Sequence, residues 1–106
     1  MKTAYECKHV KSVRAWGLMF NGEEAGRIVA DYSDNPNGAV CTLTFSCWLG
    51  PLANLEKTTE KARGYGYDKF NSCLERIFYV NGMGKEYKHD ARYFLNEKGY
   101  KVIQVI

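Results

Sequence analysis

Residues 64–80, Gly-Tyr-Gly-Tyr-Asp-Lys-Phe-Asn-Ser-Cys-Leu-Glu-Arg-Ile-Phe-Tyr-Val, decide the fold of this 106-residue chain. Their apolar side chains recur at spacings of three and four, which is the pattern of one continuous helix face. These side chains belong to Phe70, Cys73, Leu74, Ile77 and Phe78. Asn81 and Gly82 follow, and both residue types tolerate the left-handed backbone with which helices end. The sequence therefore predicts a core helix from about Tyr67 to Val80.

Three strands are predicted before this helix. Residues 13–20 are rich in apolar and aromatic side chains, and they precede Asn21-Gly22, which is typical of a two-residue hairpin turn. Residues 26–32 predict the returning strand. Residues 39–49 place their side chains in two alternating sets, so one face of the sheet lies on the core and the other is at least partly wet. Short turns between these strands indicate an antiparallel meander.

The remaining segments complete the expected fold. Residues 52–63 are polar and charged without a helical stripe, so we expect a long exposed loop with room for one helical turn. Residues 85–98 predict a second helix that ends at Gly99, and residues 100–106 predict a closing strand. The expected order is strand, strand, strand, helix, helix, strand. Burying every apolar stripe then requires an α+β two-layer sandwich, with an antiparallel sheet of about four strands and two helices on one face.

Length and composition indicate a single domain over residues 1–106. The chain is 45% hydrophobic and 25% charged, and it has no apolar run long enough to span a membrane. The first residues lack the apolar region of a signal peptide, and the four cysteines have no CxxC spacing. We therefore expect free thiols and a cytoplasmic location, with no contact with a membrane. The net charge of +3 is compatible with a polyanion as partner but is too small to indicate one.

Candidates for catalysis are few. His9 and His89 are the two histidines, and Cys73 falls on the core face of its helix, where a thiolate is disfavoured. The sequence contains no paired-carboxylate motif, nucleophile elbow or metal-ligand box. We expect a protein that is not an enzyme and that has neither cofactor nor metal site.

The glycines and tyrosines before the core helix are open to two interpretations. Gly64 and Gly66 could serve a tight strand-to-helix crossing, or the helix N-terminus and nearby lysines could bind an anion. Tyrosine and arginine are frequent anchors of interfaces, so we predict partner contacts from this segment, the loop before it and the second helix. The predicted contact residues are Lys57, Lys61, Arg63, Tyr65, Tyr67, Lys69, Tyr87, Arg92 and Tyr93.

The outer face of the predicted sheet is a second candidate surface. Its side chains are Thr42, Thr44, Ser46 and Trp48, with Arg27 and Asp31 from the neighbouring strand. This face has too few aromatic residues for the base-stacking sheets that bind RNA. The remaining interpretations are a solvated face or a surface that contacts another protein.

The octamer from Ala62 to Lys69 resembles a signature in small proteins of bacteriophages and other mobile elements. In those proteins an alternating strand and a loop precede a Gly-Tyr-Asp-Lys segment and an amphipathic helix. This chain departs from them at Asn71 and Glu75, where they often carry alanine. The resemblance implies a phage or mobile-element origin, a class in which inhibitors of host defence such as anti-CRISPR proteins are common. It implies no catalytic residue.

Two functions follow as hypotheses. The first is a non-enzymatic inhibitor that binds a host protein or nucleoprotein complex of a CRISPR-Cas-like defence system. The alternative is a nucleic-acid-binding accessory protein that uses a basic loop with Tyr65 as a stacking residue. The sequence makes no prediction of oligomeric state.

Overall fold

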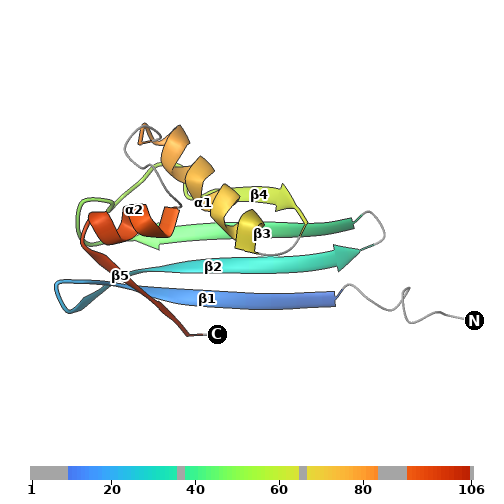
Figure 1. The fold of residues 1–106 in the computed structure, drawn as a ribbon, viewed down its shortest axis with the longest axis horizontal. Helices are drawn as coiled ribbons and strands as arrows, with labels where there is room; N and C mark the ends of the chain where they lie inside the picture. The colour runs from blue at the N-terminus through green and yellow to red at the C-terminus, as the bar shows by residue number, and fades with distance from the viewer. Residues whose placement is uncertain (1–9, 36–37, 65–66, 84–90, 106) are drawn as a thin grey trace, which may run out of the picture.

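The computed structural model describes residues 10–35, 38–64, 67–83 and 91–105, which form five antiparallel strands and two helices (Figure 1). In chain order these are β1 (Val10–Phe20), β2 (Glu23–Asn35), β3 (Gly38–Cys47), β4 (Thr59–Arg63), α1 (Tyr67–Val80), α2 (Ala91–Glu97) and β5 (Tyr100–Gln104). The strands form one sheet in the order β4-β3-β2-β1-β5. None of the described helices is long and apolar enough to cross a membrane.

The predicted hairpin and the register of the sheet decide which side chains face the core. Asn21 and Gly22 have φ angles of 53° and 82°, as their turn requires. Trp16 lies opposite Ile28, and Ile28 lies opposite Phe45, so these three side chains point to the same face. All three are buried. The hydrophobic core therefore lies on this side of the sheet.

Both helices cover this face (Figure 1). Aromatic contacts join the two layers. The ring of Phe70 in α1 lies 4.5 Å from that of Trp16, measured between centroids. Phe78 lies 5.4 Å from Phe45 in the sheet and 4.9 Å from Phe94 in α2. The five apolar residues predicted for the core face of α1 are all buried. The predicted α+β class with helices on one face is therefore confirmed, and so are the bounds of the core helix.

The number of strands and the chain order were predicted incorrectly. β4 lies inside the predicted loop and pairs with β3, with Lys61 opposite Thr42 and Arg63 opposite Val40. The order is therefore four strands, two helices and one strand. An edge strand of this kind is stabilised by main-chain hydrogen bonds to its one neighbour, so its side chains can be mainly polar. Because β4 has no apolar pattern, no strand was predicted there.

The connection from β3 to β4 is fixed rather than loose. Leu52 is buried, and its N–H donates to the Tyr100 hydroxyl at 2.9 Å. The Asn81 side chain, at the end of α1, accepts from the N–H of Lys57 at 3.3 Å and donates to its carbonyl at 2.8 Å. The exposed loop predicted over residues 52–63 is thus replaced by an anchored connection and a strand. The sequence of the connection did not indicate this anchoring, because the connection contributes main-chain groups to these bonds and the bonded side chains, Tyr100 and Asn81, lie far along the chain.

The second helix is confirmed in its last part. α2 runs from Ala91 to Glu97 and buries Phe94 and Leu95 against the core. Gly99 follows with a φ of 97°, as expected of the residue that ends a helix. The predicted start of this helix at Lys85 lies outside the described residues.

Candidate protein-binding surface

The second face of the sheet has no helix over it in the part of the chain that the structure describes (Figure 1). We call it the open face. Its position follows from the register, because Gly17 of β1 and Arg27 of β2 lie opposite each other and alternate with buried neighbours, and Ile103 of β5 lies opposite Gly17. The open face therefore runs across all five strands.

One half of the open face carries a row of apolar side chains along β1, with Arg27 and Asp31 of β2 and Lys101 of β5 beside it. We call this the apolar half, and its members lie on β1, β2 and β5. They are Val13, Ala15, Gly17, Met19, Val29 and Ile103. In an antiparallel sheet with one solvated face, each strand normally alternates apolar residues that face the core with polar residues that face solvent. Here the polar residue Arg14 points to the helix side of the sheet, while its neighbours Val13 and Ala15 point to the open face.

The apolar half is exposed at its β5 edge. Ile103 is 46% exposed and Val105 is 60% exposed. Val105 extends this half beyond the end of β5, since its N–H donates to the Ala15 carbonyl at 2.8 Å. Adjoining exposed apolar side chains are a common feature of contact sites, and Tyr79 and Val80 of α1 are exposed to a similar extent.

A hollow of about 430 Å³ lies at one end of the apolar half. Met19 and Ile103 form its apolar wall, and Asn21, Gly99 and Lys101 lie around it. Interfaces commonly place an anchoring side chain of one protein in such a concave site of the other. The hollow therefore gives the open face a position where a partner could insert a side chain.

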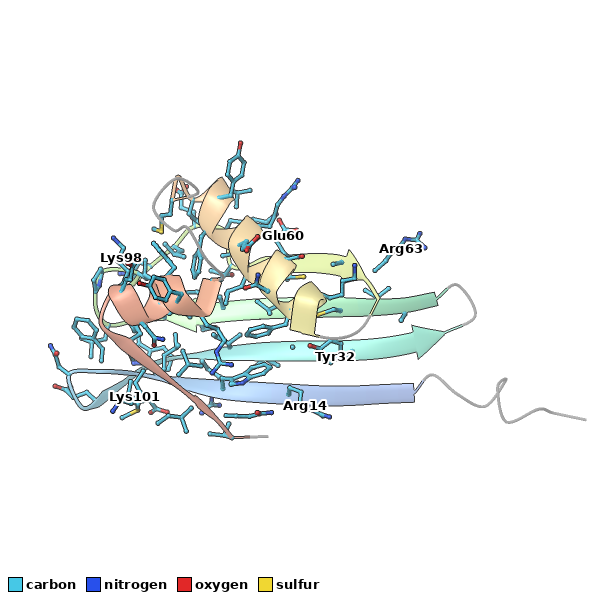
Figure 2. The ribbon with its side chains drawn as sticks, in the orientation of Figure 1. Arg14, Tyr32, Glu60, Arg63, Lys98 and Lys101 are labelled. Atoms are coloured by element: carbon cyan, nitrogen blue, oxygen red, sulfur yellow. The ribbon has the colours of Figure 1, made fainter. Side chains whose placement is uncertain are left out.

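The other half of the open face is polar and basic. Thr42 and Thr44 of β3 point outward, and Lys61 and Arg63 lie beside them on β4. Figure 2 shows Arg63 at the end of β4, at the opposite edge of the sheet from Lys101 on β5. A partner with an apolar centre and acidic groups at its margin would match this distribution.

The structure separates the predicted contact residues instead of gathering them. Lys61 and Arg63 are exposed on β4, whereas Lys69, Arg92 and Tyr93 lie on the two helices, on the other side of the sheet. Lys57 is exposed in the anchored connection before β4. Tyr65 and Tyr87 lie outside the described residues, and for Tyr67 only the main chain, which begins α1, is described.

Gly64 has the backbone conformation that the structural interpretation of this position requires. Gly64 has a φ of 105°, which other residues rarely adopt, and its N–H donates to the Ala39 carbonyl at 2.9 Å. A Cβ at this position would lie 2.9 Å from Cε of Lys69. Gly66 lies outside the described residues.

The apolar members of the open face were not among the predicted contact residues. Residues 13–20 form one mostly apolar run, and this run does contain an indication of the apolar side chains on the open face. Val13, Ala15, Gly17 and Met19 alternate with the residues that face the core, so both faces of β1 lack polar side chains over residues 15–19. A strand that is apolar on both faces needs a cover on each.

Comparison with protein-family models, curated proteins and solved structures finds no match to this chain.

Proposed function

We propose that this protein acts by binding another protein through the open face of its sheet, without catalysing a reaction. The observation that supports this is the row of apolar side chains on the open face, which is exposed at Ile103 and at the adjoining Val105, while the helices cover the core on the other face. Burying apolar surface is the main driving force for association. The hollow beside Met19 and Ile103 adds a site for an anchoring side chain.

The partner in this proposal is a complex of a bacterial defence system of the CRISPR-Cas kind. Its class rests on the resemblance of residues 62–69 to phage and mobile-element proteins. The charges of the open face restrict the contact further. Arg27, Lys61 and Arg63 would repel the basic wall of a nucleic-acid channel, so the contacted surface lies outside such a channel and carries acidic groups.

A pair of matched double variants tests the proposed surface. Ile103→Glu/Val105→Glu places two carboxylates on the open face, and Tyr79→Glu/Val80→Glu places two on α1. The replaced side chains have similar exposure, at 46% and 60% against 66% and 45%. We expect both proteins to stay folded and only the first to lose its partner in co-purification from a bacterial lysate. An equal loss in both variants would contradict the proposed surface.

Nucleic-acid binding through Lys61 and Arg63 gives a different result in the same preparation. Binding to phosphates weakens steeply as salt increases, because counterions are released. We expect no salt-dependent binding of DNA or RNA oligonucleotides by the wild-type chain. If such binding occurs and is lost in Lys61→Glu/Arg63→Glu, the nucleic-acid hypothesis replaces the proposed function.

A further inference from the structure

The first part of β1 forms an edge of the sheet, although the second part lies between two strands. β2 pairs with β1 along its whole length, whereas β5 pairs with residues 16–20 only. Val105 adds one further bond, from its N–H to the Ala15 carbonyl at 2.8 Å. Residues 10–14 therefore have a strand on one side and, within the part of the chain that the structure describes, none on the other (Figure 1).

The main-chain groups on this free side follow from the alternation of an antiparallel strand. The N–H and C=O of one residue point to one neighbouring strand, and those of the next residue point to the other. Since the Ala15 carbonyl faces the β5 side, the N–H and C=O of Lys11 and Val13 face the free side. The Arg14 guanidinium donates to the Val13 carbonyl at 3.4 Å, which agrees with this direction. This bond is long and exposed, so a main-chain N–H can replace it.

The free side of residues 10–14 is complementary to itself. When Ser12 of one copy lies opposite Ser12 of another, in antiparallel orientation, Lys11 of each copy lies opposite Val13 of the other. Each of these pairs then exchanges both of its N–H···O bonds. Val10 lies opposite Arg14 in the same register, so like charges do not face each other.

Neighbouring registers are disfavoured. A register centred on Val13 needs the space beside Ala15, which Val105 occupies. A register centred on Lys11 places two lysines directly opposite each other, which is destabilising. The segment therefore favours one arrangement of two copies, centred on Ser12.

The edge of the sheet at β4 lacks this complementarity. Two copies of β4 centred on Glu60 or on Lys61 place like charges opposite each other. Centring them on Ala62 places Lys61 opposite Arg63, which is equally unfavourable. Charge therefore disfavours self-association through β4.

We propose that residues 10–14 of β1 form a self-association site, at which a second copy of this chain adds its own residues 10–14 as an antiparallel strand. Such a contact is isologous, with its two-fold axis perpendicular to the sheet at Ser12. The two sheets then become one, and both open faces lie on the same side of it. This site does not rest on the proposed function, because main-chain groups at the edge make the contact and the open face stays uncovered.

Disulfide trapping tests the register. Ser12→Cys, in a chain that also carries Cys7→Ser, places two thiols at the two-fold axis, where opposite Cα atoms lie about 4.5 Å apart. Arg14→Cys in the same background is the matched control, because its two Cα atoms lie about 14 Å apart, too far for a disulfide. After mild oxidation, we expect non-reducing electrophoresis to show a covalent dimer of the first variant only. Absence of that dimer, or equal amounts from both variants, would overturn the proposal.

Analytical ultracentrifugation of the chain without any engineered cysteine gives an independent measurement. We expect a reversible equilibrium between monomer and dimer. Val13→Pro removes an N–H on the free side and leaves the pairing of β1 with β2 in place, as proline does at sheet edges, whereas Val13→Ala keeps this N–H. We expect the dissociation constant of Val13→Pro to be at least about tenfold higher than that of Val13→Ala.

Circular dichroism checks that Val13→Pro is folded, and the trapping experiment does not depend on this variant. A wild-type chain that stays monomeric at all concentrations contradicts the proposal. A dimer that Val13→Pro leaves intact also contradicts it, because the two copies would then associate through another surface.

Discussion

Tyr100 shows how a single side chain fixes the connection between β3 and β4. Its hydroxyl donates to the Leu49 carbonyl at 2.7 Å and accepts from the N–H of Leu52 at 2.9 Å. Its ring lies 5.1 Å from that of Phe20, measured between centroids. The phenol thus places an apolar ring in the core and a polar end on main-chain groups that have no ladder partner.

Replacing Tyr100 with phenylalanine should lower the free energy of unfolding by about 1–3 kcal/mol, because a buried donor loses its partner. Urea denaturation measures this change. The control is Tyr79→Phe, whose side chain is 66% exposed, and we expect an effect within about 0.5 kcal/mol. Equal effects of the two substitutions would show that the hydroxyl of Tyr100 does not stabilise the fold.

Tyr32, which is partly buried, and Tyr100, which is buried, also predict how stability depends on alkaline pH. Burial raises the pKa of Tyr32 to about 12, and burial with a hydrogen bond from Cys47 raises that of Tyr100. In the unfolded chain both ionise near pH 10. The unfolded state therefore loses protons first, and the free energy of unfolding should fall as pH rises from about 10 through 12. The fall should be smaller in Tyr32→Phe, and an unchanged profile in that variant would contradict the assignment.

Gly64 makes a prediction about backbone conformation. Alanine at this position should lower the free energy of unfolding by about 1–2 kcal/mol, because a side chain disfavours the left-handed backbone. Gly17→Ala is the control, since Gly17 has no positive φ and a Cβ there meets only the Ile103 carbonyl oxygen at 4.0 Å. Thermal unfolding of both variants checks this. Two equally stable variants would remove the structural reason for a glycine at the crossing.

At the scale of elements, α1 is where the sequence predicts the structure best. Its apolar residues repeat with helical spacing and all of them are buried. Leu74→Ala should therefore lower the free energy of unfolding by about 2–5 kcal/mol, as expected when a buried leucine is truncated. Ser72→Ala on the exposed side of α1 is the control in the same denaturation experiment. A cost below 1 kcal/mol for Leu74→Ala would contradict the packing of α1 on the sheet.

Strands are predicted from sequence only where their side chains alternate. The faces of β3 follow directly from its pattern, and both ends of the β1–β2 turn follow from Asn21-Gly22. β4 could not be predicted because it is held by main-chain pairing.

The candidate site was predicted only in part for a related reason. Charge and tyrosine content point to Lys61 and Arg63, whereas the apolar half becomes visible only when the register assigns each residue of β1 to a face.

At the scale of the whole molecule, the sheet separates two different surfaces. The helices bury one face, and the other presents an apolar half at β5, β1 and β2 beside a polar, basic half at β3 and β4. A single layer of strands thus serves as one wall of the core and as the proposed site of contact. This arrangement explains why β1 is apolar on both faces.

The most direct test of this account is a methyl cross-saturation NMR measurement on the complex with the co-purified partner. We predict that signal is lost from methyl groups of Val13, Met19, Val29 and Ile103 on the open face, while Val80 on α1 keeps its intensity. Losses centred on Val80 and α2, with the methyl groups of the open face unaffected, would contradict the proposed binding surface.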